Sequence, residues 1–239
     1  MTAVSAPPNL IEVRDLHVHL GESHVLQGVS FDVPEGGVTA LLGRNGVGKT
    51  TTLRAMMGLV PRRGAVTLAG SETTRLATHE IVRRGIGYVP EDRDVFAGLT
   101  VDENLRLAER NGSPRYELVY DLFPELRTRG GQRAGTLSGG QQQMVAIARA
   151  LLNDNAVLLV DEPMAGVSAE DVDELVELIR SVHRDEATTV LMVEHRMEVV
   201  VGLAERIAVM HHGALLAFDE PAKVMANETV QTAYLGEPL

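Results

Sequence analysis

The feature that most constrains the fold is a glycine-rich segment, Gly43 to Thr50, which reads GRNGVGKT. It fits the pattern G-x-x-x-x-G-K-[ST] at every fixed position. The apolar run Val38 to Leu42 precedes it, and a helical pattern from Lys49 to Gly58 follows it. This order predicts a cradle for phosphate groups. Glycines let backbone N–H groups turn inward, and the helix N-terminus adds partial positive charge.

Each residue type in this loop has an expected role toward a bound nucleotide. Lys49 should reach the β- and γ-phosphates and assist catalysis, and the Thr50 hydroxyl should ligate Mg²⁺. Further ATP contacts are expected from the loop and the first helical turn, at Gly43, Arg44, Asn45, Gly46, Val47, Gly48 and Thr51. The motif by itself predicts nucleotide binding and leaves the reaction open.

A second apolar strand, residues 156–160, ends in two acids, Asp161 and Glu162. Ligands of open α/β sheets bind beyond the carboxyl ends of the strands. Asp161 is therefore expected to hold Mg²⁺ through water, and Glu162 to act as general base for the attacking water. The alternative is that both acids merely cap the next helix. The phosphate loop upstream favours the catalytic interpretation.

Strand and helix patterns alternate over much of the chain, which predicts an α/β fold with a mainly parallel sheet and crossover helices. After residue 156 the expected order is strand (156–160), helix (about 169–184), strand (188–193), helix and strand (206–210). Between about Thr100 and Leu152 the spacing is helical instead. This block is expected to be an insert in the α/β fold.

The overall charge and the missing residue types exclude several classes of function. The 239 residues carry a formal net charge of −11 and 3% aromatic residues, with no Trp. Proteins that coat nucleic acids usually present basic faces and stacking aromatics, so no nucleic-acid partner is expected. The absence of cysteine excludes disulfides, thiolate zinc sites and a cysteine nucleophile.

The N-terminus, Met1 to Asn9, shows no signal-peptide pattern. No stretch reaches the roughly 18 apolar residues of a membrane-spanning helix. The protein is therefore expected to be soluble or peripherally bound.

A third motif, Leu137 to Gln141, reads LSGGQ and lies before a helix expected to begin near Gln141. Together with the phosphate loop, the acidic strand end and Glu194–His195, it resembles the signature of ABC-type ATPases. The resemblance runs from about residue 10 to the end of the chain. It implies a P-loop NTPase of the ABC ATPase type, with flanking helices, an N-terminal antiparallel β subdomain and an inserted helical subdomain.

The resemblance also implies a single ABC ATPase domain over residues 1–239. Its parts are an N-terminal tail (1–9), an ATP-binding core (about 10–91 and 153–219), a helical subdomain (about 92–152) and a C-terminal helical tail (220–239).

In this family the signature motif clamps the ATP held by the phosphate loop of a partner cassette. By this resemblance Ser138 would supply a hydroxyl, and Gly139 and Gly140 backbone N–H donors at a helix start. His195 matches the switch-loop histidine that contacts the γ-phosphate. A second ATPase subunit, alike or different, is therefore expected to close the two sites.

Three positions depart from the commonest family pattern. Glu91 stands where a glutamine usually faces Mg²⁺ and the attacking water, so its carboxylate could raise Mg²⁺ affinity. Leu20 falls near the usual adenine-stacking aromatic and offers no π face. Ser168 occupies the place of a common aspartate, which puts the usual contact between cassettes in doubt.

The sequence Val89–Pro90–Glu91, the stretch Gly46 to Gly58 and the tail Ala233 to Glu237 resemble the LivF type, the ATPases of branched-chain amino acid importers and of their urea and amide relatives. The likeness implies two membrane permeases, one of which inserts a coupling helix into the helical block. It also implies an external solute-binding protein, and a location on the cytoplasmic side of the membrane.

Three other functions compete with this one. A nucleic-acid machine of ABC type typically carries a coiled-coil insert, zinc-binding cysteines or two cassettes, and this sequence shows none. A regulatory cassette without hydrolysis is compatible with Glu91, Leu20 and Ser168, but Glu162 is retained. An exporter cassette is the main rival among transporters, because import is inferred from subfamily likeness alone.

Two groups of histidines are expected to have structural roles. His17, His19 and His24 are not at convincing ligand spacing, and His211–His212 is expected in a turn.

Overall fold

The computed structural model describes residues 8–110, 112–167 and 169–235. Ser168 and the last two residues of the quoted tail, Gly236 and Glu237, lie outside the described residues. None of the helices formed by the described residues is both long and apolar enough to span a bilayer.

The chain forms two compact units. The first combines the two ends of the chain, residues 1–84 and 189–239, and the second comprises residues 85–188. The helical block predicted at about 92–152 lies within the second unit.

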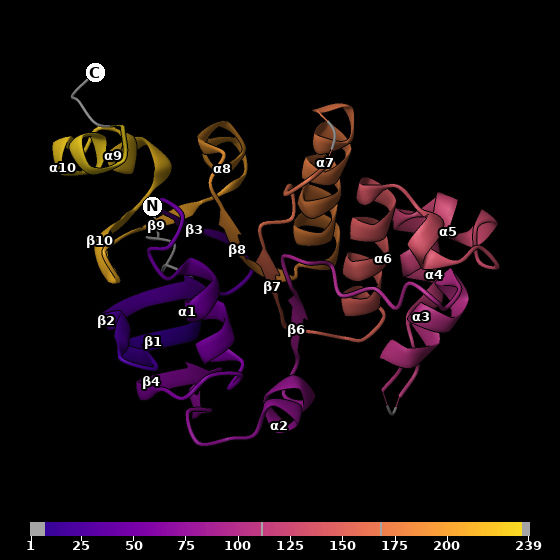
Figure 1. Cartoon of the computed structure of the whole chain (residues 1–239), viewed down its shortest axis with the longest axis horizontal. Helices are drawn as coiled ribbons and strands as arrows, with labels where there is room; N and C mark the ends of the chain where they lie inside the picture. The colour runs from indigo at the N-terminus through magenta and orange to yellow at the C-terminus, as the bar shows by residue number, and fades with distance from the viewer. Residues whose placement is uncertain (1–7, 111, 168, 236–239) are drawn as a thin grey trace, which may run out of the picture. The chain divides into compact units, whose positions relative to one another are not determined.

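The first unit contains an antiparallel sheet in the order β2-β1-β4-β5, as expected for the N-terminal region (Figure 1). Its strands are β1 Asn9–Leu20, β2 Ser23–Pro34, β4 Arg63–Leu68 and β5 Ser71–Glu72. β1 is a single strand with an irregularity at Asp15, where φ is +48°. Gly64 crosses close to this point, and an added Cβ would collide with the Asp15 carbonyl.

The same unit contains a second set of strands in the order β10-β9-β3-β8. They are β3 Val38–Leu42, β8 Thr189–Glu194, β9 Arg206–His211 and β10 Ala214–Asp219. β3 pairs in parallel with β8 and β9, while β10 is antiparallel to β9. Every residue of β3 and β8 is buried, which is typical of central strands in a parallel sheet.

The described residues of the first unit form five helices and a π-helical turn: α1 Lys49–Met56, α2 Thr78–Arg83, α8 Met197–Leu203, α9 Pro221–Met225, α10 Glu228–Val230 and the π turn Gln231–Leu235. α1 ends two residues before the predicted Gly58. α2 was not predicted, because its six residues bury only Ile81 and show no helical period. α9 and α10 lie beside β10, in yellow in Figure 1.

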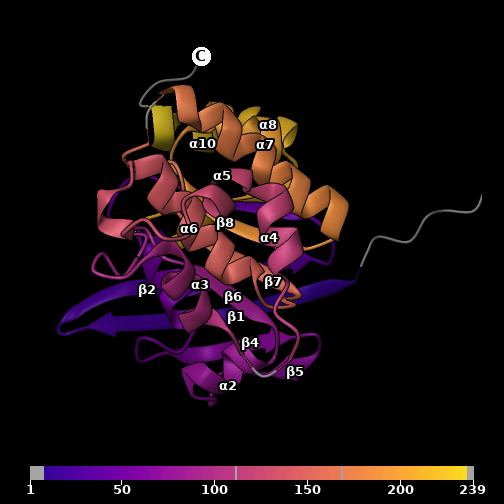
Figure 2. The same cartoon turned by 90° about the vertical axis from the view of Figure 1, so that its right-hand side faces the viewer.

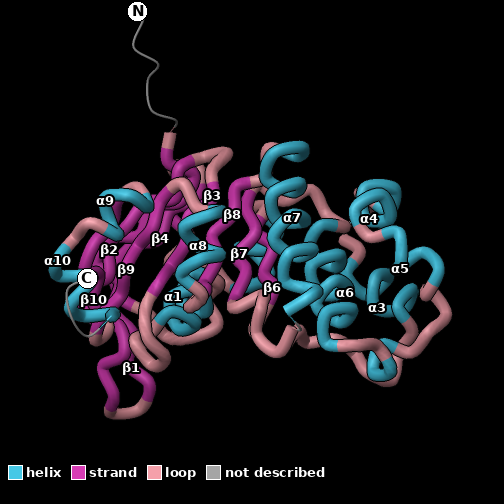
Figure 3. The backbone as a smooth tube through the Cα atoms, turned by 90° about the horizontal axis from the view of Figure 1, so that it is seen from above, coloured by secondary structure: helices cyan, strands magenta, loops and turns pink. Residues whose placement is uncertain are grey.

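The second unit consists of a parallel strand pair and a group of helices (Figures 2 and 3). The strands are β6 Ile86–Val89 and β7 Val157–Asp161. The helices are α3 Val101–Ala108, α4 Tyr116–Leu122, α5 Pro124–Thr128, α6 Gly139–Leu151 and α7 Ala169–Glu186, with a short 3₁₀ turn at Ala134–Thr136.

The prediction that α6 begins near Gln141 is wrong by two residues. Ser138 is the N-cap, and its side chain accepts a hydrogen bond from the Gln141 N–H. Gln141 is therefore already the third helical residue, and Gly139 and Gly140 form the first turn.

Candidate active site

The phosphate loop links β3 to α1 in the first unit, as predicted. Lys49 is only 5% exposed, and its ammonium donates to the carbonyls of Gly43 at 3.0 Å and Arg44 at 3.2 Å. The ammonium group is thus held by two carbonyl groups of the loop's own backbone. A lysine fixed in this way is prepared for an anion bound in the cradle, because little side-chain freedom is left to lose.

Close packing explains two glycines of the motif. An added Cβ at Gly43 would lie 2.7 Å from both the Met210 carbonyl oxygen and a Val47 methyl group. Gly48 has a φ of +104°, and a Cβ there would lie 2.5 Å from a methyl of Leu26. These positions therefore need glycine for the close approach of their neighbours, in addition to any need for approach to phosphate.

His195 directly follows β8, the strand that pairs with β3, and β3 leads into the phosphate loop. In the parallel pairing of β3 with β8, Leu42 lies opposite Glu194, so Gly43 and His195 leave the same edge of the sheet. The His195 side chain is 44% exposed. The structure of the first unit therefore brings the predicted switch histidine and the phosphate loop to neighbouring strand ends.

Glu194 holds this segment in place, a role that was not predicted. Its carboxylate is fully buried and accepts hydrogen bonds from the backbone N–H groups of His195 at 2.9 Å and Arg196 at 3.0 Å. The available signal was an acid at the last position of an apolar strand. The bonds orient the chain that carries His195.

Leu20 is the last residue of β1 and is 45% exposed. An exposed apolar side chain can cover one face of a base by apolar contact. Its predicted role at adenine stays a prediction.

The histidines of the β1–β2 hairpin are closer together than their spacing indicated. The His19 and His24 rings stack with centroids 4.1 Å apart, and His17 Nδ1 lies 3.1 Å from His24 Nε2. Desolvation, followed by repulsion from His19 and His17, lowers the pKa of His24. Within the described part of the chain, no group of three or more His, Cys, Asp or Glu residues could hold a metal ion.

In the second unit, three candidate acids follow one edge of the β6–β7 pair. Val89 lies opposite Val160 and β7 ends at Asp161, so Glu91 and the Asp161–Glu162 pair lie at neighbouring strand ends. Asp161 is fully buried, Glu162 is partly exposed with a φ of +45°, and Glu91 is exposed. The predicted acids of this unit therefore lie at the expected carboxyl ends.

Tyr88 orients one of these acids, a contact that was not predicted. Its hydroxyl donates to Asp161 Oδ2 at 3.2 Å. Tyr88 and Asp161 are 73 positions apart, and only the pairing of β6 with β7 brings them together.

Ser138 begins α6 through a reciprocal pair of hydrogen bonds. Ser138 Oγ accepts from the Gln141 N–H at 3.2 Å, and Gln141 Oε1 accepts from the Ser138 N–H at 3.1 Å. Since the serine oxygen acts as acceptor here, its own O–H can still donate to an anion.

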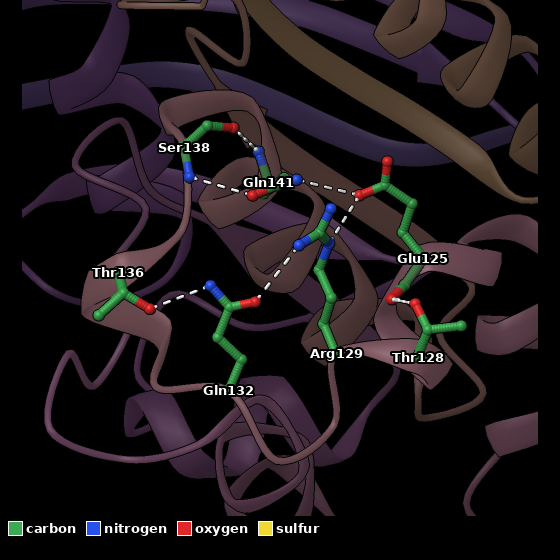
Figure 4. Close-up of polar contacts among 7 residues, drawn as sticks. All are labelled: Glu125, Thr128, Arg129, Gln132, Thr136, Ser138 and Gln141. Atoms are coloured by element: carbon green, nitrogen blue, oxygen red, sulfur yellow. Dashed lines mark hydrogen bonds and ion pairs between the residues drawn. The ribbon is translucent and has the colours of Figure 1, made fainter.

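A chain of polar contacts supports this helix start (Figure 4). Gln141 Nε2 donates to Glu125 at 3.1 Å, and the same Glu125 oxygen accepts from Arg129 Nε at 3.1 Å. Arg129 donates to Gln132 at 3.3 Å, and Gln132 donates to the Thr136 hydroxyl at 3.0 Å. The start of α6 is therefore tied to α5 and to the segment that leads into Ser138.

Comparison with known proteins places these features in a family. The family described as ABC transporter matches residues 26–165, more than half of the chain. The high-affinity branched-chain amino acid transport ATP-binding protein BraG of Pseudomonas aeruginosa is 37% identical over 95% of this chain and 100% of its own length. The lipopolysaccharide export system ATP-binding protein LptB of Escherichia coli is 35% identical, over 89% of this chain and 91% of its own.

Solved structures are similar over nearly the whole chain. A nucleotide-free ATP-binding cassette from an ABC transporter has a TM-score of 0.84 and 26% identity, covering 96% of this chain and 100% of the other. A dimeric cassette bound to ADP and phosphate after hydrolysis has a TM-score of 0.77 and 25% identity, covering 88% and 98% of the two chains.

Proposed function

Since the chain belongs to the ABC transporter family as an ATP-hydrolysing subunit, we propose that it drives import of branched-chain amino acids or of a related small polar solute such as urea or an amide. The observation that carries the proposal is the similarity to BraG along 95% of this chain. The LivF-like sequence Val89–Pro90–Glu91 supports the same subfamily.

Transport in cells that make the protein tests this proposal. Disrupting its gene is expected to abolish energy-dependent uptake of labelled leucine, or of labelled urea or amide, and the wild-type gene should restore it. An affinity-tagged chain taken from membranes should bring down two permeases. Unchanged uptake of all three solutes would contradict the proposed import.

Lipopolysaccharide export is the second candidate, because LptB is 35% identical over 89% of this chain. The same disruption distinguishes the two functions. Export predicts an unchanged uptake of leucine, urea and amides, and a loss of lipopolysaccharide from the cell surface.

The proposed mechanism gives each loop one task. The phosphate loop binds the triphosphate through its N–H groups, and Lys49 balances the charge on the β- and γ-phosphates. Glu162 takes the proton of the attacking water. His195, on the chain that Glu194 orients, contacts the γ-phosphate.

The residues proposed toward Mg²⁺ supply only oxygen ligands: the Thr50 hydroxyl and the Asp161 and Glu91 carboxylates. This donor type fits Mg²⁺, which prefers hard oxygen ligands. Asp161 is buried at the end of β7, and its carboxylate is one of these hard oxygen donors. When bound, Mg²⁺ neutralises part of the phosphate charge.

We further propose that Ser138, Gly139 and Gly140 bind the ATP held by a second cassette, identical or related. The fixed start of α6, with an O–H available to donate, supports this role. The dimeric relative bound to ADP and phosphate supports an assembly of two cassettes. The assembly would lie on the cytoplasmic face of the membrane with two permeases, and an extracytoplasmic protein would deliver the solute.

Glu91→Gln is expected to shift the Mg²⁺ dependence of ATP turnover. The amide keeps the shape of the side chain but removes a negative charge, so half-maximal activity should need more Mg²⁺, by about tenfold for one charge-assisted contact. Phosphate release is measured across a Mg²⁺ titration. A curve that overlays the wild type would place Glu91 outside the metal site.

Tyr88→Phe is expected to lower turnover by about tenfold at limiting Mg²⁺, with recovery at high Mg²⁺. The variant loses the hydrogen bond to the buried Asp161 carboxylate, a contact of about 1.5–3 kcal/mol. Tyr116→Phe is a matched control, since its hydroxyl bonds to Glu109 on exposed helix surface. Equal Mg²⁺ curves for the two variants would contradict this role of Tyr88.

A further inference from the structure

Arg93 contacts the turn that carries Glu162. Its Nη2 group donates to the carbonyl oxygens of Ala165 at 2.8 Å and Gly166 at 3.2 Å. Within the same turn, the Ala165 N–H donates to the Glu162 carbonyl at 2.9 Å. The guanidinium therefore holds the C-terminal end of the turn from Glu162 to Gly166, called the Glu162 turn below.

The same guanidinium lies against the first residue of α6. A Cβ added to Gly139 would lie 3.3 Å from Arg93 Nη2 and 2.9 Å from the Gly166 carbonyl oxygen. A Cβ at Gly166 would lie 2.9 Å from Arg93 Nη2. The Arg93 guanidinium thus packs so closely against Gly139 and Gly166 that a side-chain carbon at either glycine would be crowded. Gly139 directly follows Ser138.

The backbone of Arg93 holds a third loop. Its N–H donates to the Pro90 carbonyl at 3.1 Å and closes the turn from Pro90 to Arg93, which contains Glu91 and is called the Glu91 loop below. Arg93 and Asp94 have φ values of +64° and +49°, a left-handed conformation that non-glycine residues keep only where their surroundings impose it. The Asp94 carbonyl accepts from Arg149 of α6 at 2.6 Å.

The chain that follows is bonded to the segment leading into Ser138. The Gly135 N–H donates to the Ala97 carbonyl at 3.0 Å, and the Ala134 N–H donates to the Leu99 carbonyl at 2.9 Å. Movement of the Glu91 loop would therefore be transmitted to the start of α6 at two places, at Arg93 and at this backbone pairing.

We propose that Arg93 is a positioning residue that couples the Glu91 loop to the Glu162 turn and to the anion clamp formed by Ser138, Gly139 and Gly140. A displacement of the Glu91 loop would then change how the clamp meets the ATP of the second cassette. The consequence for that clamp rests on the proposed function. The coupling itself is a property of the single chain.

Hydrogen exchange of the full-length single chain tests the coupling. Arg93→Ala is expected to speed exchange by about tenfold in peptides covering residues 139–142 and 164–167, while peptides of α4 and α5 stay unchanged. Arg93→Lys should restore part of the protection, because an ammonium can still donate to one of the carbonyls. Arg127→Ala is the control, since Arg127 is 57% exposed in the same unit.

Unchanged exchange in both peptides would overturn the proposal, as would a uniform increase that includes α4 and α5. Should Arg93→Ala fail to fold, Arg93→Lys gives the same comparison with a smaller expected change.

A second measurement tests the effect on the clamp. In a Glu162→Gln background, Arg93→Ala should weaken ATP-dependent pairing of cassettes by about tenfold, while a fluorescent ATP analogue binds the single chain within about twofold of the parent. Pairing equal to that of the parent would overturn the transmission to the clamp. If the parent itself never pairs with ATP, the two-cassette proposal fails, and hydrogen exchange still decides the role of Arg93.

Discussion

Replacing Lys49 with alanine is expected to lower ATP turnover by about 10²–10³-fold, the usual effect of removing one preorganised donor from a developing charge. Lys49 is 5% exposed, and its ammonium donates to the carbonyls of Gly43 and Arg44. Without it, these carbonyl oxygens and the triphosphate would face each other with no cation between them. Phosphate release and binding of a fluorescent ATP analogue measure the loss.

The chain provides its own control for this experiment, because it contains two lysines, Lys49 and Lys223. Lys223 is 60% exposed and pairs with Asp219, so Lys223→Ala should retain wild-type turnover. An acylating reagent should also modify Lys223 regardless of nucleotide, and Lys49 less when ATP is bound. Wild-type turnover in Lys49→Ala would refute the phosphate role.

Glu162→Gln is expected to lower turnover by about 10²–10⁴-fold while ATP still binds, because an amide cannot accept the proton of the attacking water. ATP that is bound but not cleaved should hold two cassettes together. Light scattering after size-exclusion chromatography, with and without ATP and Mg²⁺, would detect the paired form. The natural partner is included if the chain does not pair with itself.

Glu117→Gln is the matched control, since this carboxylate is 86% exposed on α4. It should hydrolyse ATP like the wild type and should not accumulate a paired form. A Glu162→Gln chain that binds ATP yet remains single in the presence of every candidate partner would count against shared sites.

The main features of the fold and family could be predicted because they depend on contiguous residues. β3 is an apolar run that ends directly before Gly43, and β7 is an apolar run that ends at Asp161. β3 was found at its predicted bounds and β7 one residue later than its predicted range of 156–160. The α/β fold, the N-terminal antiparallel sheet and the ABC transporter family are confirmed. The start of α6 was misplaced by two residues, because the N-cap role of Ser138 was not recognised.

The supporting contacts could not be predicted, because they join residues far apart in the chain. Tyr88 reaches Asp161 over 73 positions, and Arg93 reaches Ala165 over 72. No local pattern marks either residue, since each depends on strand pairing or on a loop with unusual φ values. The stacked histidines likewise follow from the register of β1 with β2, in which His19 lies opposite His24.

The polar chain from Gln141 through Glu125 to Thr136 has a consequence for how two such subunits meet. The donors at the start of α6 are held in place by the subunit's own side chains. Docking there loses little conformational entropy, so the speed of assembly should depend mainly on collision and orientation. If two cassettes share one triphosphate as proposed, their disassembly should then depend on the loss of that phosphate.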